Sequence, residues 1–549
     1  MITLEERSKV IHDVDSLYEL AACRLADSLN ASHGVDWHVQ TWKILFGPWL
    51  RWLTHTTVIR HQMLEHAILQ YSSSSYLRCF RTNFVPARPR TMTDAMWTLL
   101  GQSWTTWHFQ WLAENLFQDL LVPAACSEPE VQATDELSPG PATHRDDGNF
   151  RPERTLASRS HREQASRRMP LVFTDTTIDR LIRAWAKIIG HRRLGHYTSI
   201  LSGPIPSTIL ARSSDISIAT HDSDSELLQG LCQLIEIQAP NSFSIDISAL
   251  TAWYHDEGMT PGAGPVISST SWQHTDNAMW FMTLTKARGG RLVNVQSGGG
   301  YGTLQHVEAE RHQRDVSDVF VSWGWKDNHY QGAKVVPAGQ SHSRDRLRRW
   351  PRRKPGSRIV LVENQYPRYG LHLESTPYAD EGEHLADQYA VFLRGLDPRL
   401  ALNSALRTYP VSYGFDMGKR LTESYPDLPI LPPTKSFAAI ERTSGLLVYG
   451  YATTNVIRSL QRNSPPCVFF LTPSIWQHRA SFAPDIALLQ DAGVIHGTAS
   501  AAAAHVNSIY SDREAWWQST WDIRRDIADR LVRRSFGWRF QLWRAINSS

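Results

Sequence analysis

Four glycines lie within the stretch VQSGGGYG, residues 295–302, directly after an apolar run that predicts a strand. Glycine adopts positive φ angles freely and has no Cβ, so a charged ligand can approach the backbone N–H groups of such a loop. A flexible spacer is not normally placed at the end of a strand, whereas a tight structural turn is a real alternative. The spacing is not G-x-G-x-x-G, so it does not indicate a dinucleotide cofactor. We predict that the ligand is bound by Gly298, Gly299, Gly300 and Tyr301.

The stretch YGYATTNVIRSL, residues 449–460, is a second candidate binding site. Its apolar run ends at Tyr451, and Thr453 and Thr454 begin a predicted helix. A threonine oxygen at a helix start caps free N–H groups, and the same N–H groups together with the helix dipole form an anion site. The pattern therefore fits either a plain N-cap or a site for the phosphate of a nucleotide. In the second interpretation the ligands are Thr453, Thr454 and Asn455.

Several side chains in the central part of the chain could serve as acids or bases. They are Asp256, Glu257, His274, Asp276, Glu308 and Glu310. Transfer of a group to a hydroxyl needs a base to accept its proton, or a carboxylate nucleophile. We predict Asp276, Glu308 and His274 as catalytic residues, and Arg368 and Arg407 as phosphate contacts, with a structural role as the alternative for each. The chain has neither a G-x-S-x-G elbow nor an H-E-x-x-H helix.

Composition excludes several classes of protein. Lys and Arg total 57 and Asp and Glu 54, so the net charge of +3 does not predict a nucleic-acid partner. The five scattered cysteines contain no C-x-x-C pair, so we predict no metal site and a reduced, cytoplasmic protein. The N-terminal residues are polar and no apolar run reaches about 18 residues, so neither a signal peptide nor a transmembrane helix is expected. The 21 tryptophans indicate core residues, with peripheral membrane contact as the alternative.

The elements that would position these residues fall into segments of different character. Residues 1–125 show apolar residues at helical spacing and predict a helical N-terminal region. Residues 126–168 are rich in Pro, Ser, Glu and Arg, which is typical of a disordered loop or linker. Residues 341–357 are basic and contain prolines; they predict an interdomain linker, with a phosphate or acidic-surface contact as the alternative.

Short apolar runs alternate with helical patterns in the rest of the chain. One set lies in residues 169–340 and a second in residues 358–549. Strand, helix, strand order predicts parallel sheets with crossover helices. We therefore predict an α/β, GT-B-like fold, with two Rossmann-like domains facing a cleft and ligands beyond the carboxyl ends of the strands.

Four stretches resemble a family of transferases associated with bacterial surface-polysaccharide biosynthesis. They are HGVDWHVQTWKILFGPWL, VQSGGGYG with VSDVFVSWGW, YGYATTNVIRSL, and AGVIHGTASAAAAHVNSIYSDREAWW. The resemblance extends over most of the chain but not over residues 126–168. It implies a metal-independent, GT-B-like glycosyltransferase without a cofactor, in which a nucleotide sugar is the donor and a glycan or lipid-linked molecule the acceptor. CMP-linked acidic sugars are one donor class that it implies.

The sequence departs from this family pattern at two positions. Ser297 stands where the family has a histidine before the glycines, and Arg458 stands where transferases of this type have a glutamate that holds the donor ribose. The first change removes an imidazole and the second reverses a charge. Both bear on donor handling, so the alternative function is a catalytically degenerate scaffold that binds a glycan or nucleotide in a polysaccharide assembly system. In either case the inner face of the membrane is an alternative location.

Overall fold

The computed structural model describes most of the chain. The described residues are 4–71, 84–117, 172–174, 199–210, 216–326, 329–339, 356–364, 366–370, 373–378, 381–409, 414, 417–463, 465–473, 476–532 and 544. The predicted disordered segment 126–168 lies outside them, as does most of the predicted basic linker, residues 341–355. No helix in the described part of the chain is long and apolar enough to cross a membrane.

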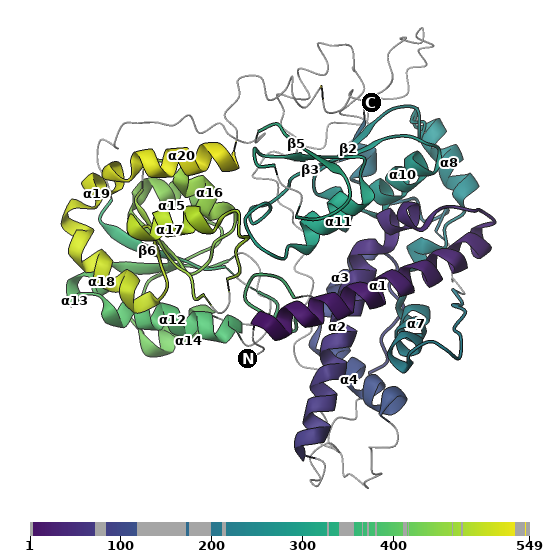
Figure 1. The fold of residues 1–549 in the computed structure, drawn as a ribbon, viewed down its shortest axis with the longest axis horizontal. Helices are drawn as coiled ribbons and strands as arrows, with labels where there is room; N and C mark the ends of the chain where they lie inside the picture. The colour runs from purple at the N-terminus through teal and green to yellow at the C-terminus, as the bar shows by residue number, and fades with distance from the viewer. Residues whose placement is uncertain are drawn as a thin grey trace.

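A parallel sheet of five strands forms the first α/β domain (Figure 1). Its order is β1 (Val172–Phe173), β2 (Val266–Ser268), β3 (Leu292–Val295), β4 (Val319–Ser322) and β5 (Lys334–Pro337). Helix α10 (Asp276–Ala287) connects β2 to β3, and α11 (Glu308–Val316) connects β3 to β4. Strands β2 and β4 are buried on both faces, as strands covered by helices on both sides must be. The glycine loop leaves this sheet at the carboxyl end of β3.

A second parallel sheet of six strands forms the second domain. Its order is β11 (Ile495–His496), β10 (Cys467–Phe470), β9 (Ser444–Tyr449), β6 (Arg358–Val362), β7 (Ser404–Arg407) and β8 (Ile430–Leu431). The chain builds β6, β7 and β8 in one direction and then returns to place β9 on the other side of β6. The topological switch point, where ligands bind in open parallel sheets, therefore lies between β6 and β9. The predicted α/β, GT-B-like fold class is confirmed.

Helices cover both faces of the second sheet. They are α12 (Glu381–Gly395), α13 (Pro398–Leu402), α14 (Met417–Ser424), α15 (Phe437–Thr443), α16 (Thr454–Leu460), α17 (Ala483–Asp491), α18 (Ala499–Ile509), α19 (Arg513–Ser519) and α20 (Trp521–Leu531). Two separate hydrophobic cores result, one containing α12 and α18 and the other α16, α17 and α20. The second of these cores also contains Tyr301 and Phe320 from the first domain, so the two domains share buried apolar surface.

Helices also precede and cover the first sheet. They are α1 (Leu4–His33), α2 (Val39–Tyr71), α3 (Met92–Leu100), α4 (Gln102–Leu116), α7 (Glu226–Gln238), α8 (Ile247–Asp256) and α9 (Ser271–His274). Helix α1 ends before Gly34, which has a φ of +62°. Pro48 lies inside a continuous α2. Trp42, Trp49 and Trp104 are fully buried with the side chains of α10 in one core, so these tryptophans support packing and present no surface.

Helix α1 connects the N-terminal region to both α/β domains (Figure 1). Near its start, Arg7 forms a buried ion pair of 2.6 Å with Glu381 of α12 and donates to the carbonyl oxygen of Glu374 at 3.0 Å. Farther along, Asp15 forms ion pairs with Arg51 of α2 and Arg311 of α11. The N-terminal helices are therefore packed into the α/β part of the molecule.

Candidate functional site

The glycine loop after β3 has a fixed conformation. Gln296 accepts the backbone N–H of Trp323 and the indole N–H of Trp325 on its side-chain oxygen, each at 2.9 Å. Gly302 has a φ of +72°, and a Cβ atom at this position would lie 2.4 Å from the ring of Trp325. Gly300 also has a positive φ, of +93°. These contacts exclude a flexible spacer and specify one path of the backbone.

The loop contacts the start of α16, which lies 155 residues away in the sequence. The N–H of Gly299 donates to the side-chain oxygen of Thr454 at 2.8 Å. A Cβ atom at position 299 would lie 2.1 Å from the backbone nitrogen of Thr454 and 2.4 Å from the backbone carbonyl carbon of Thr453. The two stretches that the sequence indicated separately therefore meet in one place, between the carboxyl ends of both sheets.

The two threonines do not cap their own helix. Thr453 occupies the N-cap position of α16, which has no side-chain cap hydrogen bond, so the plain N-cap interpretation is wrong. Asn455 instead holds the turn closed: its side-chain oxygen accepts the N–H of Thr453 at 2.8 Å, and its side-chain nitrogen donates to the carbonyl of Tyr451 at 3.0 Å. The hydroxyl of Thr454 is directed to the glycine loop. A phosphate site at this turn stays a prediction.

A buried ion pair fastens the loop to the second domain. Glu310 and Arg479 are 2.8 Å apart with side chains 0% and 2% exposed, and Glu310 also accepts the N–H of Gly302 at 2.9 Å. Arg479 donates from Nε to the carbonyl of Leu304 at 2.9 Å. Glu310, which is one of the predicted acid–base candidates, thus positions the glycine loop. Sequence reasoning missed Arg479, because no local pattern distinguishes it from other loop arginines.

Charged and aromatic residues also collect near the carboxyl end of β6, beside the switch point. Glu363 follows β6 and is buried, and it accepts the N–H of Tyr409 at 2.8 Å. Burial lowers the pKa of Arg407, while the charge of Glu363 acts in the opposite direction. Burial raises the pKa of Tyr451, whose ring lies in the same electrostatic neighbourhood. The structure places Arg407 near this edge, whereas Arg368 is exposed and lies over the ring of its neighbour Tyr369.

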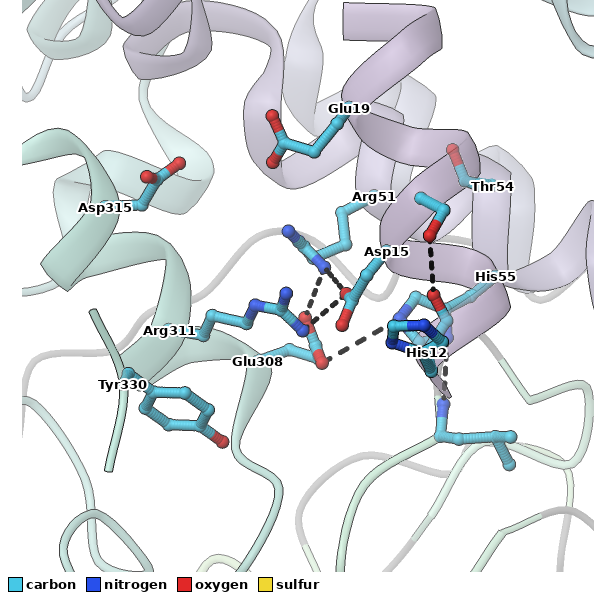
Figure 2. Close-up of polar contacts among 12 residues, drawn as sticks. His12, Asp15, Glu19, Arg51, Thr54, His55, Glu308, Arg311, Asp315 and Tyr330 are labelled. Carbon is cyan, nitrogen blue, oxygen red and sulfur yellow. Dashed lines mark hydrogen bonds and ion pairs between the residues drawn. The ribbon is translucent and has the colours of Figure 1, made fainter. Parts of the chain in front are cut away.

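Glu308 begins α11 and enters a charge cluster between α11 and the helices α1 and α2 (Figure 2). Its carboxylate lies 3.1 Å from the guanidinium of Arg51 and 3.8 Å from Nε2 of His55. Arg51 also contacts Asp15 at 2.9 Å, and Arg311 forms an ion pair with the same Asp15. Glu308 therefore fastens α11 to α2, while the ion pair of Arg311 with Asp15 links α11 to α1. A catalytic role for Glu308 stays a prediction.

The other two predicted catalytic residues lie near the start of α10. Asp276 is buried, and its two carboxylate oxygens accept the N–H of Met92 at 2.9 and 3.1 Å. Met92 is the first residue of α3, so Asp276 satisfies a free donor at the start of that helix. His274 ends α9, and its side chain lies outside the part that the structure describes. The structure thus brings Asp276 to a helix start, and no contact that it gives links Asp276 to the glycine loop.

A capping role for Asp276 predicts how its variants behave. Burial raises the pKa of Asp276, so its carboxyl stabilises the fold at acidic pH and loses this contribution as pH rises through the folded-state pKa. Asp276→Asn should unfold within about 1 kcal/mol of the wild type and gain on it as pH rises through the folded-state pKa of Asp276. Asp276→Ala should lose about 1–3 kcal/mol, because Met92 N–H is left unpaired. Urea unfolding measures both; a stable Asp276→Asn protein without sugar transfer would instead support catalysis.

The two departures from the family pattern both have partners here. Ser297 Oγ lies 3.2 Å from the hydroxyl of Tyr301, which is buried beneath the loop. Arg458 forms an ion pair of 2.7 Å with Glu441 of α15, and Arg462 contacts the same carboxylate at 2.6 Å. A glutamate at position 458 would lie beside Glu441 and repel it. The charge reversal at Arg458 is therefore matched by a carboxylate on the neighbouring helix.

The chain is similar to one protein family along most of its length and to several solved structures over part of it. The model of the LIC12162 family transferase matches residues 3–545. Among solved structures, S. aureus TarM is 9% identical over 55% of this chain and 59% of its own, with a TM-score of 0.37. Anabaena HepE is 11% identical over 69% and 100%, with a TM-score of 0.36, and Acinetobacter baumannii MurG is 13% identical over 58% and 81%, with a TM-score of 0.31.

The chain spans 59% of the length of TarM. No curated protein matches it in sequence. The family model covers almost the whole chain, from the first N-terminal helix to the end of the second domain, and the predicted resemblance to a transferase family is confirmed. The chain belongs to the LIC12162 family of transferases.

Proposed function

We propose that the protein transfers a sugar from a nucleotide-activated donor to a hydroxyl of a glycan or lipid-linked acceptor. The observation that carries the proposal is the contact between Gly299 N–H and Thr454 Oγ1, at 2.8 Å. It joins two stretches that each favour an anionic ligand and places them beside the switch point of the second sheet. Membership of a transferase family supplies the reaction type.

Backbone groups are the main donors for the leaving phosphate in this proposal. The glycine loop and the first turn of α16 both present N–H groups, and such preorganised donors stabilise the negative charge that develops on a leaving group. Arg407, at the end of β7, lies close enough to Tyr451 to act on its charge, and we propose that it supplies a positive charge. The remaining predicted donor contacts, Gly298, Gly300 and Asn455, flank the same contact. We propose no metal in this step, and no cofactor besides the donor itself.

The donor nucleotide is the finer part of the proposal. A CMP-linked acidic sugar follows from the sequence resemblance alone, and the position of Arg458 bears on it. In related transferases a glutamate at this position holds the donor ribose. In this chain the position is Arg458, which is paired with Glu441, so other groups would have to accept hydrogen bonds from the ribose. We therefore propose cytidine as the first candidate for the nucleoside of the donor, and a binding measurement has to identify it.

A panel of nucleotides tests the donor site. Thermal unfolding of the full chain with CMP, UDP, GDP, dTDP or ADP should show a higher midpoint for one of them, because a ligand that binds only the folded state stabilises it by about 2.7 kcal/mol at 100 times its Kd. Thr454→Val removes the hydroxyl that accepts Gly299 N–H and should weaken that shift. Thr443→Val, on the outer helix α15, is the matched control and should leave it unchanged. No shift with any nucleotide would contradict the proposal.

The alternative is a scaffold that binds a nucleotide or glycan without turnover. The features that favour it are Ser297 and Arg458, both of which depart from the family pattern. A nucleotide shift without detectable sugar transfer would support the scaffold. Peripheral membrane contact also stays a prediction. The exposed apolar side chains Met63, Leu69 and Val85, which lie toward the end of α2 and after it, are the described residues that would carry it.

A further inference from the structure

Arg60 of α2 lies buried between α2 and α4. Its side chain is 4% exposed. One terminal nitrogen contacts Nδ1 of His108 at 2.8 Å and the other donates to Thr105 Oγ1 at 3.0 Å. The guanidinium carbon lies 4.9 Å from the ring centre of Trp104 and 5.3 Å from that of Phe109. Arg60 is therefore held in place by neutral groups and aromatic faces.

No carboxylate of the described residues forms an ion pair with Arg60. This distinguishes it from other buried arginines, such as Arg7, Arg51 and Arg479, each of which contacts an acidic side chain. Arg524, which is fully buried, also has no carboxylate, but all three of its nitrogens donate to oxygens of Thr520, Arg462 and Trp517. Burial without a counter-charge is unfavourable for a guanidinium, and it lowers the pKa of Arg60 to about 10.

The surroundings of Arg60 are suited to a negatively charged group. A guanidinium has five N–H donors, and the two bonds to His108 and Thr105 use two of them. Its planar fork matches the two oxygens of a carboxylate or phosphate. His108 is buried beside Arg60, and both burial and the guanidinium charge lower its pKa, so this imidazole is neutral and does not compete as a cation. Tyr369 and Tyr378, both partly exposed, lie close enough to act on the charge of Arg60.

We propose that Arg60, together with Thr105 and His108, is an internal anion site that binds the carboxylate or phosphate group of a small molecule. The partly exposed side chains Phe109, Tyr369 and Tyr378 form its outer side, where α4 and residues 366–370 and 373–378 approach α2. The site lies apart from the glycine loop and Thr454. It stands independently of the proposed sugar transfer.

Thermal unfolding of the full chain at constant ionic strength tests the site. The probes are sodium phosphate and sodium glucuronate, each compared with sodium chloride. The wild type should gain about 2 °C or more in at least one probe. Arg60→Met should respond to at least one probe less than the wild type does, because it lacks the guanidinium that would bind the anion. Arg60→Lys should keep the charge but lose most of the response, since it lacks the fork.

Arg524→Met is the matched control. It should unfold at a lower temperature, because it leaves three carbonyl and hydroxyl oxygens without a donor, and it should keep the full response to the probes. The probe with the larger shift identifies the ligand as a phosphate or a carboxylate. Equal responses of the wild type and Arg60→Met, or no response of the wild type to either probe, would overturn the proposal.

Discussion

Gly299→Ala should abolish nucleotide binding and sugar transfer. The added Cβ would lie 2.1 Å from Thr454 N and 2.3 Å from Thr454 Cα, so the loop and α16 would have to separate. Backbone atoms on both sides prevent the relaxation that a flexible side chain would allow. We expect a loss of about 1–3 kcal/mol in the free energy of unfolding from overpacking, and loss of the nucleotide-dependent rise in midpoint. Thermal unfolding with and without the nucleotide measures both.

The neighbouring glycine supplies the control. A Cβ at Gly298 would meet only the ring of Tyr301, at 4.0 Å, which is an ordinary contact. Gly298→Ala should therefore keep its free energy of unfolding, even though it changes the same loop in the same way. If Gly299→Ala binds the nucleotide as tightly as the wild type does, the contact with Thr454 is not part of the donor site.

Glu310→Ala should lower the free energy of unfolding by about 3–5 kcal/mol. The substitution leaves the guanidinium of Arg479 buried at 2% exposure without the carboxylate that it contacts at 2.8 Å, and it removes the acceptor of Gly302 N–H. Removal of one partner from a buried pair is more damaging than replacement of both. The double variant Glu310→Met with Arg479→Met should therefore recover part of the loss. Urea unfolding of the three proteins measures the difference.

An exposed ion pair in the same protein calibrates this result. Arg420 and Glu383 are 2.7 Å apart, but each side chain is 43% exposed. Solvent screens such a pair, so Glu383→Ala should change the free energy of unfolding by less than about 1 kcal/mol. A loss of similar size in Glu310→Ala would show that the buried pair is not what holds the glycine loop.

Most of the sheet architecture could be predicted from the sequence, because buried parallel strands give short apolar runs that end in polar or glycine-rich turns. The stretches that became β3, β4, β6 and β10 are of this kind. Both halves of the candidate site could also be located, since Gly299 and Thr454 each follow a strand. Their contact could not be predicted, because the packing of two domains depends on surfaces that no local pattern records.

Side-chain roles were harder to predict than positions. Asp276 and Glu310 are of the same residue types as a catalytic base, yet one accepts the first N–H of a helix and the other pairs with Arg479. Only the partner distinguishes these roles, and each partner is more than 160 residues away in the sequence. Nothing in the sequence indicated that Arg60 is buried, because an arginine in a helix rich in aromatic residues is normally predicted to lie at the surface.

The contact between Arg7 and Glu381 has a consequence for synthesis on the ribosome. The two residues are 374 positions apart, so α1 emerges long before the helix that neutralises its buried arginine. At about 5–20 residues per second, the delay is roughly 20–75 s. During that time the apolar face of α1 has only its helical neighbours to cover it, and the nascent chain presents that face to chaperones. The yield of native protein should therefore depend on the rate of translation.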